Sequence, residues 1–319
     1  IPGTFGFGDV LTGTLADGSA FLLAGDLGDL LARNTTTLEA VDISPADMTP
    51  TVLSSGTGGS KGLRSGQTLT ITGDARLRDE FTAIGATLNI EGGVVGESSQ
   101  VASTQVRISG GVVLDDFDVL QGSTVEIHGG VIGDGFSAMD SVVNIFGGTI
   151  GDDFQAFRNS TINIFGASIG DGFATVRSNN TINIAGGIIG DDFDIDSGNT
   201  VNISGGVVGD RFLAETGSAV NLFVTDISID GLDLGLSLGD TMEIDQRGGA
   251  LLEATLADGS LFDLQLNDNV FASGVDFVST DATLTVTLVP TPGAAGVLGL
   301  SGLFAARRRR ERHSPTVDL

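Results

Sequence analysis

The sequence predicts an all-β protein in which short parallel strands wind into a single-stranded β-helix, or β-solenoid, with coils of about 19 residues. Three observations predict this fold. A segment that alternates apolar and polar side chains recurs at a nearly constant spacing. A glycine-rich turn and then a phenylalanine follow at similar offsets. No segment has a convincing helical period of apolar residues. We expect a right-handed helix, because crossovers between parallel strands are right-handed.

The polar centre of each strand-like segment marks the repeat. In the coil that begins at Val201, this residue and Ile203 point inward, Asn202 points outward, and two glycines then turn the chain. The corresponding centres are Asn89, Arg107, Glu126, Asn144, Asn163, Asn183, Asn202 and Asn221, with Thr70 in a degenerate first coil. One coil cannot bury its apolar face, whereas stacked coils can. We therefore expect about eight coils, with Asn on Asn outside and with Ile and Phe inside.

The regions that flank the repeats carry a duplicated segment. Residues 66–228 hold the repeats, and we expect residues 229–288 to form a β-rich cap that covers the end of the solenoid. Within the cap, Thr255–Phe262 matches Thr14–Phe21 almost residue for residue.

The first copy of this segment has no coils before it. We therefore interpret residues 1–48 as part of the cap of a preceding solenoid unit that is missing from this chain. Residues 49–65 are rich in Ser and Gly and are expected to form a linker.

Composition and charge restrict the function. The 319 residues carry a net charge of −26 and contain 49 Gly but no Cys. The absence of Cys excludes disulfides, thiolate catalysis and zinc–cysteine sites. An acidic body repels phosphate backbones, so we expect no nucleic-acid partner, and it attracts divalent cations.

The segment 289–310 has three parts in a fixed order. A Pro-x-Pro motif ends the last strand, an apolar stretch at 294–306 is expected to form a short helix, and a basic cluster follows, before a tail at 311–319. The residues of the motif and of the cluster are Val289, Pro290, Thr291, Pro292, Arg307, Arg308, Arg309 and Arg310.

This layout resembles the PEP-CTERM sorting signal of exosortase systems. The Pro-Thr-Pro form, combined with Gly-rich parallel β-helix repeats, is similar to the planctomycete-type variant of that signal. The resemblance implies export by a signal peptide and transient membrane retention by the C-terminal helix. It also implies cleavage near the Pro-x-Pro motif by an exosortase-type enzyme, followed by delivery to the cell surface or the extracellular matrix.

An acidic turn recurs from coil to coil. Stacking would bring these carboxylates to about 5 Å from one another, and like charges at that distance repel unless a counter-ion lies between them. Calcium prefers such oxygen ligands. The candidate calcium ligands are Asp116, Asp134, Asp153, Asp171, Asp192 and Asp210. The alternative is a solvated acidic edge that keeps solenoids from associating.

Two outward rows are candidates for carbohydrate contact. His128, Phe146 and Phe165 take the same outward position in successive coils, where their rings are candidates to stack on sugars. The alternative is that the rings stack on one another or lie under the cap. The Asn row is a second flat surface, and its alternative is a ladder of amides that bond to one another without any ligand.

We interpret the chain as an exported, surface-sorted structural or adhesive β-solenoid of the cell envelope or extracellular matrix. The alternative is a calcium-dependent module that binds exopolysaccharide. A polysaccharide lyase or glycosidase is supported only by analogy of fold. Among the arginines of the body, only Arg158 and Arg177 are expected to share a face, and the coils lack the long loops that carry active sites. We therefore expect no enzymatic activity.

Overall fold

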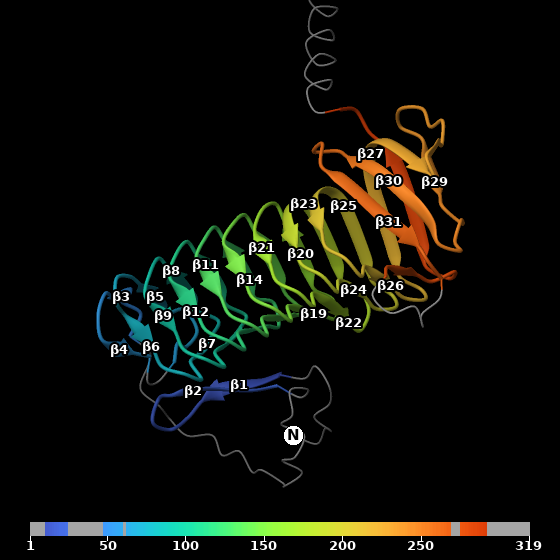
Figure 1. Cartoon of the computed structure of the whole chain (residues 1–319). Coiled ribbons are helices and arrows are strands. Elements are labelled where there is room, and N and C mark those ends of the chain that lie inside the picture. The colour runs from blue at the N-terminus through green and yellow to red at the C-terminus, as the bar shows by residue number, and fades with distance from the viewer. Residues whose placement is uncertain (1–9, 25–46, 60–61, 269–274, 292–319) are drawn as a thin grey trace, which may run out of the picture.

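The computed structural model describes residues 10–24, 47–59, 62–268 and 275–291. These residues form an all-β structure without helices, in which a parallel β-solenoid runs into a β-rich cap (Figure 1). One sheet of nine parallel strands receives one strand from each turn, so the solenoid has about nine turns. The predicted fold class is confirmed, while the short C-terminal helix, Pro292 and the cluster at 307–310 fall outside the described residues.

Each turn contributes strands to three faces. The first face carries the alternating segments: β5 (Thr68–Ile71), β8 (Thr87–Ile90), β11 (Gln105–Ile108), β14 (Thr124–Ile127), β17 (Val142–Ile145) and β20 (Thr161–Ile164). The second face follows the glycine turn: β6 (Arg76–Leu77), β9 (Val94–Val95), β12 (Val112–Val113), β15 (Val131–Ile132), β18 (Thr149–Ile150) and β21 (Ser168–Ile169). In the next two turns one long strand spans both faces: β23 (Thr181–Ile189) and β25 (Thr200–Val208).

The third face is the nine-stranded sheet. Its strands are β7 (Thr82–Ile84), β10 (Gln100–Ala102), β13 (Asp118–Leu120), β16 (Ser137–Met139), β19 (Gln155–Phe157), β22 (Ala174–Val176), β24 (Asp194–Ile195), β26 (Leu213–Ala214) and β32 (Phe277–Val278). The last of these belongs to the cap segment, so the chain returns from the cap to complete the final turn.

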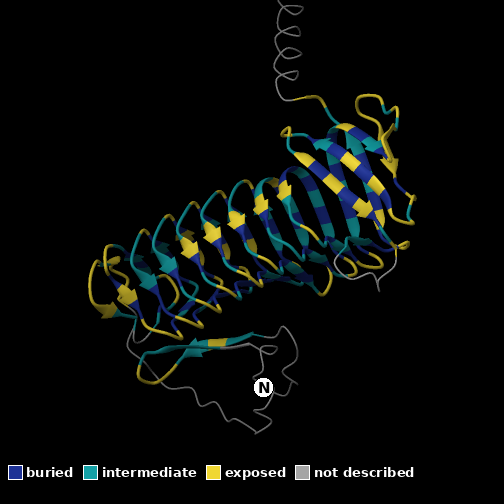
Figure 2. Ribbon diagram, viewed as in Figure 1, coloured by how far each residue is buried: buried dark blue, intermediate teal, exposed yellow. Residues whose placement is uncertain are grey.

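The strands of the first face stack in the register that the repeat predicts. Asn144 pairs with Asn163, which pairs with Asn183, and the row continues through Asn202 to Asn221. Ile203 is fully buried and Asn202 is half-buried, so the predicted facing of the strands is confirmed. Figure 2 shows buried residues along the inside of the tube.

Phenylalanine forms the centre of the core. A Phe recurs at one inward position in seven of the turns and is almost fully buried in each: Phe81, Phe117, Phe136, Phe154, Phe173, Phe193 and Phe212. Most of these rings stack face to face, as between Phe154 and Phe173, whose centroids are 4.6 Å apart. Such stacking adds to the energy of burying apolar area.

The solenoid begins earlier than the repeat predicts. Residues 49–65, expected to be a linker, contain β3 (Thr51–Leu53) and β4 (Thr57–Gly58), which pair in parallel with β5 and β6. The main-chain amide of Thr72 donates to the carbonyl of Leu53 at 2.9 Å. A coil of this kind needs few apolar side chains, because the adjacent edge strand supplies backbone hydrogen bonds regardless of sequence.

The cap is built on one long strand, β27 (Ala219–Ile229), which extends beyond the solenoid. β33 (Thr283–Leu288) pairs with it in parallel, and β30 (Ala250–Leu256) pairs with it antiparallel. The cap also contains β28 (Leu232–Asp233), β29 (Thr241–Glu243) and β31 (Leu261–Leu266). Buried and other residues alternate along β30 and β31 (Figure 2), so one face of this hairpin covers the core.

The duplicated segment forms the same hairpin twice. β1 (Val10–Thr14) and β2 (Ala20–Ala24) pair antiparallel, as β30 and β31 do. The amide of Leu15 donates to the carbonyl of Ser19 at 2.7 Å, and Leu256 and Ser260 make the equivalent bond at 2.8 Å. The first hairpin packs against Ala102, Leu120 and Met139 on the third face. Its interpretation as the cap of a preceding unit stays a prediction.

Candidate functional site

The ring column predicted on the first face is present and exposed. His128 and Phe146 stack with centroids 4.7 Å apart and planes 12° apart, and Phe146 and Phe165 stack at 5.0 Å and 8°. The side chains of Phe146 and Phe165 are 45% and 52% exposed. Because the rings lie face to face along the solenoid axis, they cover one another's faces and present mainly their edges to solvent.

At its N-terminal end the ring column is joined to charged side chains. The guanidinium of Arg107 lies 3.1 Å from a carboxylate oxygen of Glu126 and 3.0 Å from Nε2 of His128. The same carboxylate oxygen lies 3.3 Å from the imidazole. The side chains of Arg107 and Glu126 fix the orientation of the His128 ring, so this end of the column is held by polar contacts.

Beside the rings runs the predicted Asn ladder, and its amides bond to one another. Nδ2 of Asn163 donates to Oδ1 of Asn144 at 2.8 Å, and Asn183, Asn202 and Asn221 repeat this contact at 2.7 to 2.8 Å. An amide has two N–H donors and two oxygen lone pairs, and the ladder uses one of each. The ladder therefore holds the amides in one orientation while each keeps further hydrogen-bonding capacity.

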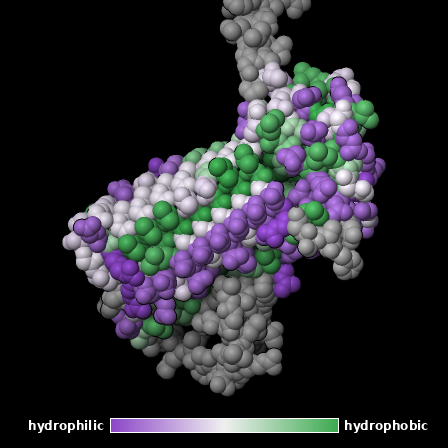
Figure 3. All heavy atoms as spheres, viewed as in Figure 1, coloured by the Kyte–Doolittle hydropathy of each residue, from purple (hydrophilic) through white to green (hydrophobic). Residues whose placement is uncertain are grey.

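A shallow hollow interrupts the ring column beyond Phe165. In the next turn Ala185 takes the position of the ring. A register shift then sets Ala185 opposite Gly205, so that Ser204 is the extra residue of the following turn, and a ring returns at Phe223. The residues that line the hollow are Asn183, Ile184, Ala185, Asn202, Ser204 and Phe223. Figure 3 shows one side of the molecule, on which a band of hydrophobic residues runs along the solenoid beside a hydrophilic row. Sequence reasoning identified the rings but missed this gap.

The acidic turn forms two columns, and the first is a hydrogen-bonded ladder. Oδ1 of Asp152 accepts the main-chain N–H of Asp171 at 2.9 Å, and Oδ1 of Asp171 accepts that of Asp191 at 2.9 Å. A Cβ at Gly170 would collide with Oδ1 of Asp152. The recurring Gly-Asp dipeptide is thus explained: glycine makes room for the aspartate of the preceding turn, and that aspartate binds the backbone of the following one.

The second acidic column occupies a left-handed backbone position. Asp116, Asp153 and Asp192 have φ of 58°, 60° and 61° there, and Gly135 and Gly172 take the same position in the intervening turns. Asp and Gly tolerate this conformation better than other residues. Asp192 forms an ion pair with Arg211.

The six predicted calcium ligands are therefore divided between these two columns. Asp134, Asp171 and Asp210 lie in the first, and Asp116, Asp153 and Asp192 lie in the second. None of them belongs to the one group of three or more carboxylates or imidazoles that the described residues bring within 4.8 Å. Calcium binding at the acidic turn stays a prediction.

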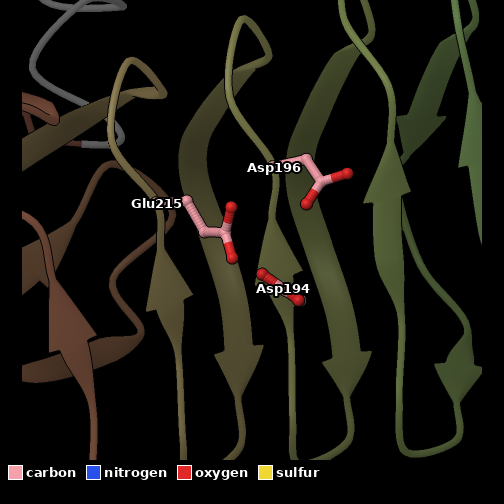
Figure 4. A group of neighbouring side chains, drawn as sticks. All are labelled: Asp194, Asp196 and Glu215. Carbon is pink, nitrogen blue, oxygen red and sulfur yellow. The ribbon is translucent and has the colours of Figure 1, made fainter. Parts of the chain in front are cut away.

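That group is Asp194, Asp196 and Glu215, from the turns next to the cap (Figure 4). Oδ1 of Asp194 is buried and has no hydrogen-bond partner. Burial, followed by the charges of Glu215, Asp196 and Asp192, raises the pKa of Asp194 to about 6. Converging carboxylate oxygens can share a proton or hold a hard cation. A sequence signal for this group exists: Asp194 is acidic, whereas Gln155 and Ala174 occupy the same position in the two preceding turns.

Arg158 and Arg177 share a face, as the sequence predicts. Together with Asn159, Ser178 and Asn179 they line an open cavity at the turns that follow the third face. The guanidinium of Arg158 forms an ion pair with Asp140 at 3.2 Å. The carboxylate of Asp140 therefore offsets the charge of Arg158.

No protein-family model, curated protein or solved structure matches this chain. Within the described residues, no helix is long and apolar enough to cross a membrane.

Proposed function

We propose that this chain is an exported, surface-displayed β-solenoid with a structural or adhesive role in the cell envelope or extracellular matrix. The observation that carries the proposal is that the outward rows of the turns largely bond along the axis to their own counterparts. The Asn row, the ring column and the first acidic column each link one turn to the next. Side chains used in this way stiffen a rod along its length, as in other stacked repeats.

The exposed carboxylates of the acidic columns support a role for the protein on the cell surface, where many copies lie close together. Carboxylates exposed in successive turns repel a second copy of the same face and so keep the rods soluble and apart. The ladder of Asp to backbone N–H bonds holds these charges in place.

Export is proposed from the C-terminal segment, with an exosortase-type enzyme as the processing partner. Mass spectrometry of the C-terminus of the protein recovered from the surface of the producing cells tests this proposal. We expect a mature form that lacks residues 307–310. Replacing Pro290 and Pro292 with Ala should leave the segment in place, whereas Pro50→Ala should be processed normally. Recovery of the surface protein with Arg307 intact would contradict sorting by this route.

A second candidate function is calcium-dependent polysaccharide binding through the acidic turn. The carboxylates repeated along the axis favour it. If calcium binds the native state, millimolar calcium should raise the melting temperature and a chelator should reverse the rise. An unchanged melting temperature would remove calcium from the proposal.

We further propose that the chain has a binding or structural role and does not cleave polysaccharides. Incubation with neutral and acidic polysaccharides, followed by chromatography of their chain length, tests this directly. Unchanged chain length is the expected result, and shortened chains would replace the structural proposal with an enzymatic one.

A further inference from the structure

The ring column has a gap of two members. Phe146 covers one face of Phe165, and in the described residues no ring lies against its other face. Ala185 and Ser204 follow, and then Phe223. Turns of a solenoid are about 4.8 Å apart, so Phe165 and Phe223 are separated by about 14 Å along the axis. This leaves room for a ring-sized group beside the exposed side chain of Ala185, in the hollow that Ser204 also lines.

The side of this gap is formed by fixed polar groups. Asn183 and Asn202 line it, held in the ladder by bonds of 2.7 Å. Each amide keeps one N–H and one lone pair beyond the ladder. The hydroxyl of Ser204 donates to the carbonyl of Ile184 at 3.3 Å and keeps its own acceptor capacity. A ligand in the gap thus meets an aromatic face and hydrogen-bonding amides together.

The cap holds this region rigid. The turn between β30 and β31 lies against it: the amide of Asp258 donates to the carbonyl of Ser204 at 3.1 Å, and the amide of Ala257 donates to that of Phe223 at 2.9 Å. A carboxylate oxygen of Asp258 accepts the N–H of Gly206 at 2.9 Å. Groups fixed in this way bind without a large ordering cost.

The chemistry of the gap favours one class of ligand over others. A peptide strand would need a free sheet edge, yet β23, β25 and β27 are each paired on both sides. A polyanion would meet a protein with a net charge of −26. A neutral sugar chain offers apolar ring faces for Phe165 and hydroxyls for the amides.

We propose that the gap between Phe165 and Phe223 binds a sugar unit of a neutral, extended glycan without calcium. The sugar ring stacks on the open face of Phe165, beside Ala185. Because the sugar rings of an extended glycan lie in planes that contain the chain direction, the glycan crosses the solenoid axis at this point. This site goes beyond the structural role proposed above and does not depend on export. It differs from the predicted contact at His128, Phe146 and Phe165, because the faces of the first two rings are covered and the open face of Phe165 is the surface used.

The test is affinity electrophoresis and calorimetry of the full chain with soluble neutral β-linked glucan, mannan and xylan, and with alginate and polygalacturonate as anionic probes. We expect at least one neutral glycan to bind, equally well with calcium and with chelator. Failure of every neutral glycan, or retention by anionic glycans alone, would overturn the proposal. Binding that requires calcium would indicate that the glycan contacts the acidic turn instead, and this result would also overturn the proposal.

Matched variants locate the site. Ala185→Phe continues the ring ladder into the gap and should weaken binding by at least about tenfold. Ser109→Phe adds a ring at the opposite end of the same column and should leave affinity unchanged. Phe165→Leu removes the open face and should weaken binding about tenfold, whereas Phe146→Leu should change it less than threefold. Circular dichroism and a thermal melt verify folding. Unaltered binding by folded Ala185→Phe or Phe165→Leu would overturn the site.

Discussion

The turns in the middle of the solenoid and the turns that meet the cap share one core but differ on the outside. From Thr124 to Ile164 the strands of the first face pair without a register shift, and the ring column is unbroken. From Thr181 to Phe223 the ring column stops, the register shifts after Ile184, and Asp194 has a buried oxygen without a partner. The Ile, Val and Phe rows of the core continue across both regions, and so does one buried row of Ser and Asn side chains.

This difference shows how a repeat protein can carry a site. Inward residues must repeat, because each turn is buried by its neighbours. Outward residues are free to depart from the pattern, since solvent or the cap can supply the hydrogen-bond partners of their polar groups. The gap at Ala185 and the carboxylates around Asp194 both lie in the last turns before the cap.

The largest expected effect tests whether the core is the same in both regions. Ile145→Asp in the middle and Ile203→Asp near the cap each bury an uncompensated charge, and each should cost about 3–5 kcal/mol of unfolding free energy. Asn202→Ser, on the outward row, should cost only about 1 kcal/mol. Urea unfolding measures all three. A cost for Ile203→Asp no greater than that for Asn202→Ser would mean that the strand faces the other way.

A smaller effect separates the two acidic columns of the middle turns. Asp152→Ala removes the acceptor for the N–H of Asp171 and should cost about 1–2 kcal/mol. Asp153→Gly should stay within about 0.5 kcal/mol of the wild type, because relief of the left-handed backbone offsets the greater entropy of unfolded glycine. Chemical denaturation of both variants checks the contrast. Equal losses would indicate that the columns have the same role.

The smallest effect concerns Asp194 beside the cap. Its pKa, raised to about 6, lies above the unfolded value of 3.8, so this group stabilises the fold below pH 4 and loses that contribution as the pH rises through 6. Partial solvent screening limits the effect to about 1 kcal/mol. Asp194→Asn should therefore be more stable than the wild type at pH 7.5 but not at pH 4.

Urea unfolding at both pH values measures this difference. Asp226→Asn, at an exposed position on β27, is the matched control and should show no such change with pH. An equal response of the two variants at both pH values would show that charging Asp194 carries no penalty in the folded protein.

Much of the fold follows from short-range patterns. The spacing of Asn89 to Asn221 and the alternation around each centre predicted the parallel register and the buried Phe column. The sequence analysis did not identify a buried polar row, in which the main-chain amide of Asn180 donates to Oδ1 of Asn199 at 2.9 Å. The Ser and Asn residues of these turns carry no apolar pattern that would indicate burial. The extra coil at β3 was also missed, because strand pairing through the backbone does not require a recognisable side-chain pattern in a Ser- and Gly-rich segment.

The sequence by itself determined which residues repeat, which of them point inward, and that His128, Phe146 and Phe165 form one column. These properties depend on the two-residue period of a strand and on the need of each coil for a neighbour. Only the tertiary structure decided that stacked rings cover one another's faces, that the aspartates of the Gly-Asp turn bind the next backbone, and that Asp194 meets Glu215. Such contacts join residues about one turn apart, and their outcome depends on distances of a few ångströms that no sequence pattern records.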